Sequence, residues 1–119
     1  MILFFAFSYL SAKNQGDTDL IRKWYLNKYF VESVAYEPEK KEKDDFIEFK
    51  SNGTFEAQSE GIIEKGTWMP NQSGGYLELK DESGQTFKVY IISITEDVLI
   101  LRYDIPEISD IQVKYVSNK

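Results

Sequence analysis

Residues 44–57 read DDFIEFKSNGTFEA, and this stretch decides the expected fold. Apolar and polar side chains alternate on both sides of Ser51-Asn52-Gly53, with the period of a half-buried β-strand. An Asn-Gly pair between two alternating segments is the strongest short-range hairpin signal, because both residue types accept positive φ angles. The stretch therefore predicts two antiparallel strands joined by a tight turn.

The same alternation continues on both sides of this hairpin. Upstream, residues 24–36 are rich in Tyr, Phe and Val and predict one long strand, whose broken parity indicates a bulge. Downstream, turn residues separate five further expected strands at 62–69, 77–79, 85–94, 98–103 and 111–116. Short connections between all of these strands require antiparallel neighbours.

Eight antiparallel strands leave no open edge when they close into an up-and-down barrel. A two-sheet sandwich is the alternative architecture. A short helix, capped by Asp17 or Thr18 and continuing to Lys23, is expected to plug one end, which favours the barrel. The prediction is an all-β, eight-stranded antiparallel up-and-down barrel over residues 20–119, preceded by a polar linker at 13–19.

Met1–Ala12, MILFFAFSYLSA, is the one strongly apolar run of the chain. It is too short to span a bilayer as a helix. Its length suits the apolar region of a signal peptide, and Ser11-Ala12 supplies small residues for cleavage before Lys13. A buried first strand or helix is the alternative. The run predicts a protein exported to the periplasm or secreted, without stable membrane insertion.

The composition excludes several classes of function. The chain has no His and no Cys, which removes disulfides, zinc sites with nitrogen or sulfur ligands, thiol nucleophiles and imidazole-based mechanisms. A net charge of −6 opposes binding to a phosphate backbone. We therefore expect no catalytic residues, no metal, no cofactor and no nucleic-acid partner.

Carboxylates are the remaining candidates for chemistry. The acidic loop over residues 37–45 offers oxygen ligands for Ca²⁺, but it lacks the spacing of an EF-hand. Asp45 and Glu64 are expected to face inward at the same end of the barrel, where paired carboxylates would suit a glycosidase. Acids at strand ends near a barrel mouth more often simply reach water, and a non-catalytic protein is the favoured interpretation.

One pattern of residues resembles a known family. Trp24 follows the expected helix, and the later motifs are Asp45-x-Ile47-x-Phe49-x-x-x-Gly53-x-Phe55, Gly66-Thr67-Trp68, Leu77-x-Leu79 and Leu99-x-Leu101. Over residues 17–116 this pattern resembles the small bacterial exported lipocalin-like (calycin-type) domains. The resemblance implies an eight-stranded calycin-type barrel, and because its motifs are structural it names no ligand.

Two positions depart from the lipocalin pattern. The lipocalin signature has Gly two residues before the Trp, where this chain has Arg22. Larger lipocalins often pack an Arg from near the last strand over that Trp, where this chain offers only Lys114. The ligand type of the larger transport members is therefore not carried over.

The direction of each strand determines which end of the barrel its inward side chains are expected to occupy. Trp68 is expected in the core of the closed end near Trp24, with Gly66 making room beside a large ring. The closed end is predicted to hold Trp24, Phe49, Phe55, Trp68 and Leu77. The open end is predicted to hold Ala57, Leu79, Phe87, Leu101 and Tyr103, with Tyr36 at the rim.

The open-end residues are the candidate ligand-binding site. A barrel of eight strands has room for packed side chains or for one small ligand. Ala57 leaves space, and Tyr36 and Tyr103 supply polar groups at the rim of an apolar pocket. We expect a small hydrophobic ligand; the alternative is a protein-interaction or inhibitor module that uses the open-end loops. A cavity would favour the first, and a filled barrel with an exposed aromatic patch would favour the second.

Overall fold

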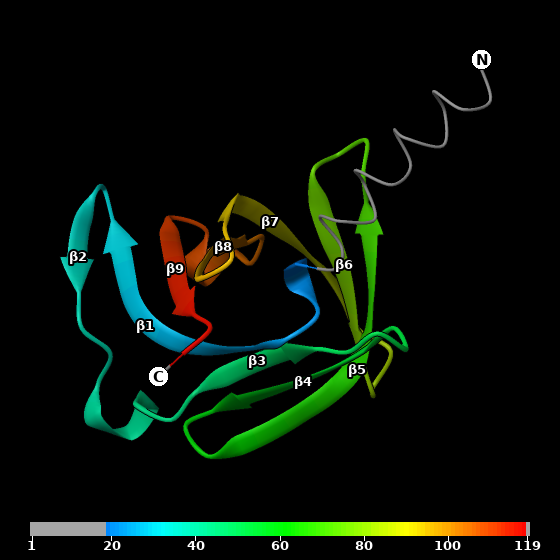
Figure 1. Cartoon of the computed structure of the whole chain (residues 1–119), viewed down its shortest axis with the longest axis horizontal. Helices are drawn as coiled ribbons and strands as arrows, with labels where there is room; N and C mark the ends of the chain where they lie inside the picture. Colours follow the sequence, from blue (N-terminus) through cyan, green and yellow to red (C-terminus); the bar gives the residue numbers. More distant parts are fainter. Residues whose placement is uncertain (1–18, 119) are drawn as a thin grey trace.

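The computed structural model describes residues 19–118, whose strands form one antiparallel sheet that closes on itself (Figure 1). β1 pairs with both β3 and β9, so eight strands form a barrel, and β2 is an extra strand paired with β1. The predicted all-β, eight-stranded barrel is confirmed. The strands are β1 (Lys23–Val31), β2 (Val34–Tyr36), β3 (Phe46–Phe49), β4 (Thr54–Ser59), β5 (Ile62–Asn71), β6 (Tyr76–Asp81), β7 (Thr86–Ile94), β8 (Val98–Tyr103) and β9 (Ile111–Val116), with 3₁₀ turns η1 (Lys40–Glu42) and η2 (Pro106–Ile108).

The single long strand expected over residues 24–36 is instead a hairpin, so that prediction is wrong. β1 ends at Val31, and β2 returns antiparallel to it after a two-residue turn. The turn residues Glu32 and Ser33 have φ angles of 50° and 69°. Neither residue is Gly, Asn or Asp, so the usual signal of such a turn is absent. The expected bulge does exist, because the pairing of β1 with β9 shifts between Leu26 and Lys28.

The helix expected to continue to Lys23 and plug the barrel is not found within residues 19–118. Among the described residues before β1, which begins at Lys23, Asp19 and Leu20 have a helical backbone and the next two residues do not. The proposed capping residues Asp17 and Thr18, the expected leader at 1–12 and the linker up to residue 18 lie outside the described residues. Side chains close this end instead: Leu20 and Trp24 are buried, and the Trp24 indole N–H donates to the Leu20 carbonyl at 3.1 Å.

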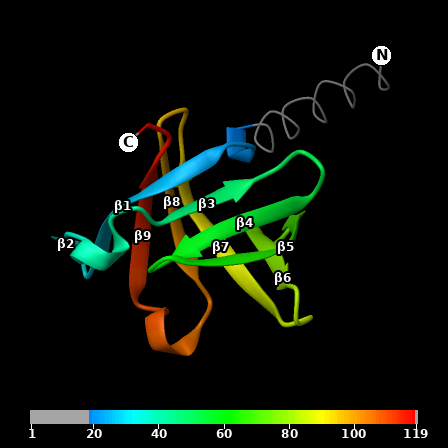
Figure 2. The ribbon, with the colours of Figure 1, turned by 90° about the horizontal axis from the view of Figure 1, so that it is seen from below.

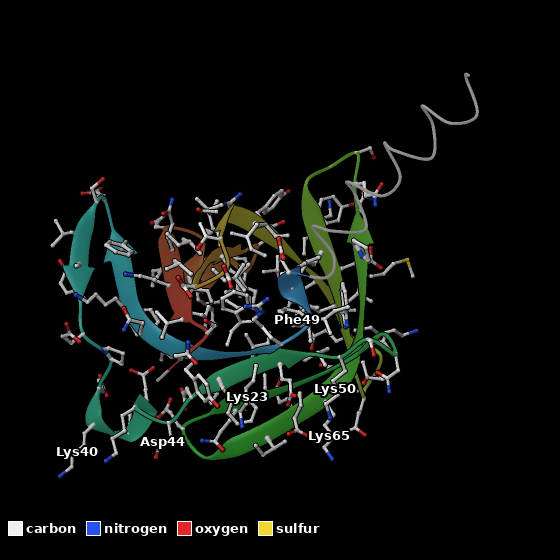
Figure 3. The ribbon with its side chains drawn as sticks, in the orientation of Figure 1. Lys23, Lys40, Asp44, Phe49, Lys50 and Lys65 are labelled. Carbon is white, nitrogen blue, oxygen red and sulfur yellow. The ribbon has the colours of Figure 1, made fainter. Side chains whose placement is uncertain are left out.

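The hairpin predicted at Ser51-Asn52-Gly53 is confirmed. Phe49 pairs with Phe55 across it, the Lys50 N–H donates to the Thr54 carbonyl at 2.9 Å, and Gly53 has a φ of 85°. Figure 3 shows Phe49 inside the barrel, while Lys40 and Lys65 point away from it. The core is made by Leu20 and by inward side chains from seven of the eight barrel strands: Leu20, Trp24, Ile47, Phe49, Phe55, Leu77, Leu79, Val89, Leu99, Leu101, Val113 and Tyr115. The remaining barrel strand, β5, adds the partly buried Trp68, which packs against them.

Trp68 lies at the margin of this core and not inside it, which corrects the prediction for this residue. It is only partly buried, its ring meets Phe49 edge-on at 5.5 Å between centroids, and its indole N–H donates to the Lys50 carbonyl at 3.0 Å. The expected close approach at Gly66 is real, but its partners are the Phe55 ring and the backbone of the neighbouring strand β6.

The two barrel ends differ in their connections. Figure 2 shows η2 at one end of β9 and the C-terminus at the other. The η2 end also receives the β4–β5 turn, where Glu60 and Gly61 have φ angles of 51° and 86°. The loops that follow β2, β4, β6 and β8 therefore gather at the end opposite Trp24, which is the predicted open end.

Candidate functional site

A cavity of about 310 Å³ opens among these loops. Its wall comes from all eight barrel strands, from Asp45 just before β3 and from the β8–β9 connection. Aromatic rings line much of it: Tyr29, Phe46, Phe55, Phe87, Tyr103 and Tyr115. Aliphatic side chains complete the apolar surface: Leu26, Ile47, Ala57, Leu79, Ile105, Ile108 and Val113. Four polar residues face it: Asp45, Gln58, Ser59 and Glu64.

The six predicted site residues divide into three groups. Ala57, Leu79, Phe87 and Tyr103 line the cavity. Leu101 is fully buried in the core and does not reach the cavity wall. Tyr36 is 53% exposed on β2, because the turn at Glu32-Ser33 carries this residue off the barrel. The prediction that Tyr36 lies at the rim assumed one long strand over residues 24–36, and it is wrong because that strand is a hairpin.

Sequence reasoning missed two tyrosines that line the cavity. Tyr29 faces inward because the irregularity between Leu26 and Lys28 resets the parity of β1. Tyr115 shares parity with Val113 along β9, and this alternation was a usable signal. The residues of the β8–β9 connection carry no periodic signal, and their place over the cavity follows from the closed barrel.

Tyrosine hydroxyls form one polar part of the site. The hydroxyls of Tyr103 and Tyr115 lie 2.6 Å apart, and the Tyr29 hydroxyl donates to Oε2 of Glu42 at 2.6 Å. Burial raises the pKa of Tyr103 to about 12 and the pKa of Tyr115 well above its usual value. Burial and the Glu42 bond also raise the pKa of Tyr29. All three phenols therefore stay protonated at neutral pH.

Among the described residues, Asp45 is the charged residue that is buried, with 7% of its surface exposed. Its Oδ1 accepts a hydrogen bond from the Glu60 backbone N–H at 2.9 Å. Two backbone bonds fix its position: its N–H donates to the Glu42 carbonyl, and its carbonyl accepts from Leu26. Burial raises the pKa of the Asp45 carboxyl, the Glu60 bond opposes that shift, and the charge of Glu42 adds to it.

Glu64 faces the same cavity from β5. It pairs with Ala57, which pairs in turn with Ile47, so these residues form one row across the inner face of three strands. The expectation that Asp45 and Glu64 face inward at one end is confirmed. Within residues 19–118, no group of three or more His, Cys, Asp or Glu is arranged to hold a metal ion.

Two solved structures share this architecture. A lipocalin-like protein from Bacteroides uniformis ATCC 8492 superposes with a TM-score of 0.56 at 17% identity, covering 83% of this chain and 98% of the other. A DUF4847 family protein from Bacteroides vulgatus ATCC 8482 superposes with a TM-score of 0.61 at 12% identity, covering 87% and 96%. The fold is lipocalin-like. No protein-family model matches the sequence, and no curated protein matches it either.

Arg22 lies at the closed end of this lipocalin-like barrel, over the Trp24 ring. Its guanidinium lies 5.3 Å from the centre of the Trp24 ring, and its Nη1 donates to the Glu96 carbonyl at 2.7 Å. The contact combines a cation–π interaction with a bond to the β7–β8 turn. Arg22, at the position where the lipocalin pattern expects Gly, thus places a cation over the Trp24 ring.

No helix within residues 19–118 has the length and apolar character needed to cross a bilayer.

Proposed function

We propose that the protein is a non-catalytic binding protein that takes up one small apolar or amphipathic molecule in the open-end cavity. The observation that carries this proposal is the cavity itself. Its volume of about 310 Å³ lies at the lower end of the range typical of small-molecule sites. Its wall is mainly apolar and aromatic with a few polar groups, which is the usual composition of such sites.

The alternative is a protein-interaction module. Val34 and Tyr36 on β2 are each 53% exposed and lie outside the barrel. These two side chains form a small apolar surface next to the open-end loops. Ile62 and Ile63, at the start of β5 after the β4–β5 turn, are also exposed. The alternative rests on these exposed side chains, whereas the carrier proposal accounts for an unfilled space inside the barrel.

Export is a separate part of the proposal. It rests on the apolar run Met1–Ala12 and the small residues Ser11-Ala12 before Lys13. N-terminal sequencing of the protein from its native cell tests it. A mature chain that begins near Lys13 supports export, and an intact Met1 on the cytoplasmic protein contradicts it.

Two matched substitutions test the carrier proposal with N-phenyl-1-naphthylamine, an uncharged apolar fluorophore. Ala57→Phe places a ring in the cavity and should abolish uptake of the fluorophore while leaving the urea midpoint close to that of the wild type. Ala35→Phe adds the same bulk to an exposed residue of β2 and should leave uptake unchanged. If the wild type takes up no fluorophore and Ala57→Phe loses about 1–3 kcal/mol through overpacking, the carrier proposal is wrong.

A further inference from the structure

The charged side chains that line the cavity are all acidic. Asp45 and Glu64 face it, and no Lys or Arg belongs to its wall among residues 19–118. The nearby lysine is Lys41, which is mostly exposed and forms ion pairs with Glu39 and Glu60. Figure 3 shows Lys40 and Lys65 directed away from the barrel. The cavity is therefore an apolar, aromatic space with a negative charge at its edge.

The Asp45 carboxylate lacks a cationic partner within the described part of the chain. Its one side-chain bond there comes from a backbone N–H, and none of the four ion pairs includes it. An ionised carboxylate taken out of water is costly unless a cation or several donors compensate it. Asp45 is also the polar wall residue that is most deeply buried. A positively charged group in the cavity would supply the missing partner.

The aromatic wall favours the same kind of ligand. Burial is the main cause of the raised pKa of Tyr29 and of Tyr115, and the nearby charge of Asp45 adds to it. An organic ammonium group is attracted to the faces of aromatic rings and to carboxylates, whereas a carboxylate ligand would meet two like charges here. The apolar interior beyond these groups accepts a hydrocarbon body.

Building on the proposed carrier function, we infer that the ligand is a small cationic amphiphile, an organic amine whose ammonium group pairs with Asp45 and Glu64. Its hydrocarbon part lies among the rings and aliphatic side chains of the cavity. Neutral apolar molecules enter the same space with lower affinity, and fatty acids bind worst.

Three eight-carbon probes that differ only in their head group test this inference: octylamine, 1-octanol and octanoate. Each is titrated at neutral pH against bound N-phenyl-1-naphthylamine, and its displacement constant is measured. We expect octylamine to bind at least about tenfold more tightly than 1-octanol, which is the effect of one additional charge-assisted hydrogen bond. Octanoate should bind more weakly than 1-octanol.

Three variants separate the site from the general attraction of an acidic protein for cations. Asp45→Asn keeps the shape of the side chain and an oxygen that accepts the bond from the Glu60 N–H, and Glu64→Gln changes an exposed residue. Each should reduce the octylamine preference, and the double variant should bring it to within about twofold of 1-octanol. Glu78→Gln removes the same charge from an exposed, outward position opposite Lys88 and should leave the preference intact.

The outcomes distinguish failure of the inference from failure of the carrier proposal. If the fluorophore and 1-octanol bind without an octylamine preference, the amine inference is wrong and the carrier proposal stands. The amine inference is also wrong, with the carrier proposal intact, if the preference survives in the double variant or disappears equally in Glu78→Gln. If neither the fluorophore nor any of the three probes binds, both are wrong.

Discussion

The hydroxyl groups of Tyr103 and Tyr115 hydrogen-bond to each other inside the barrel, 2.6 Å apart. Tyr103 is the last residue of β8, whereas Tyr115 is paired with Leu99 near the start of that strand. The two side chains therefore reach toward each other along the barrel wall. Both line the cavity, so this bond joins the packed core to the proposed binding site.

Removing one member of this pair should destabilise the fold. Tyr103→Phe leaves the Tyr115 hydroxyl buried without its partner, and we expect a loss of about 1–3 kcal/mol in the free energy of unfolding. Urea melts of both single variants and of Tyr103→Phe/Tyr115→Phe measure the coupling. The double variant should lose less than the sum of the singles, and strictly additive losses would contradict the pairing.

Because of the same two tyrosines, we expect the folded state to lose stability at alkaline pH. Burial raises the pKa of Tyr103 from 10.0 to about 12, so the folded state holds its phenolic proton more tightly than the unfolded chain does. This contribution is complete below about pH 10 and is lost as the pH rises through the folded value. Unfolding free energies measured across this window should fall less steeply in Tyr103→Phe/Tyr115→Phe. Equal slopes would show that these phenols titrate normally.

Because of Asp45, we expect the free energy of unfolding to depend on pH in the acidic range. Burial raises its pKa, so the folded state favours the neutral acid, and the penalty for the charge appears as the pH rises above the usual carboxyl range. The charges of Glu42, Glu60 and Asp44 act in the same direction. Asp45→Asn should therefore be more stable than the wild type at neutral pH, with a difference that shrinks on acidification.

Asp81 is the matched control with the opposite sign. Its carboxylate accepts bonds from Ser83 and Gln85 in an exposed turn, and the bond from the Ser83 side chain is the largest of several that lower its pKa. Its contribution is present at neutral pH and is lost as the pH falls through the folded value. Asp81→Asn should be less stable than the wild type at neutral pH and should approach it in acid. Parallel pH profiles for the two variants would refute the assignment for Asp45.

Period-two alternation was enough to predict much of the barrel and part of the cavity. It placed Ala57, Leu79 and Phe87 inward, because uninterrupted strands keep their parity from one end to the other. It failed where the backbone departs from regular pairing. Tyr36 leaves the barrel at a turn formed by non-glycine residues, and Tyr29 enters the cavity after a bulge.

The charge pattern of the site was visible in the sequence only in part. Asp45 and Glu64 were expected to face inward from strand parity alone. The Asp45 N–H bonds locally to Glu42 of η1, but the depth of Asp45 also depends on backbone N–H groups of Leu26 and Glu60, which are distant in sequence. No local pattern encodes such an arrangement, since it arises only when the barrel has closed.

Gly66 gives the sharpest test of packing in the barrel wall. A Cβ at this position would collide with the carbonyl oxygen of Lys80, and it would lie 2.8 Å from the Phe55 ring and 2.9 Å from Cα of Asp81. The closest neighbour is backbone held in the β5–β6 ladder, so a rotamer change cannot relieve the contact. We expect Gly66→Ala to lose about 3 kcal/mol, the upper part of the range for overpacking.

Gly61 is the matched control for Gly66. A Cβ added to Gly61 would meet open space, but the φ of this residue is 86°, so the cost of Gly61→Ala is that of a left-handed backbone alone, about 1 kcal/mol. Phe55→Leu should not rescue Gly66→Ala, because the ring is the more distant obstacle. Urea melts of Gly66→Ala, Gly61→Ala and the double variant Phe55→Leu/Gly66→Ala test this explanation. If Gly66→Ala loses no more than Gly61→Ala, or if Phe55→Leu restores it, the β5–β6 backbone is not the obstacle that excludes a side chain at this position.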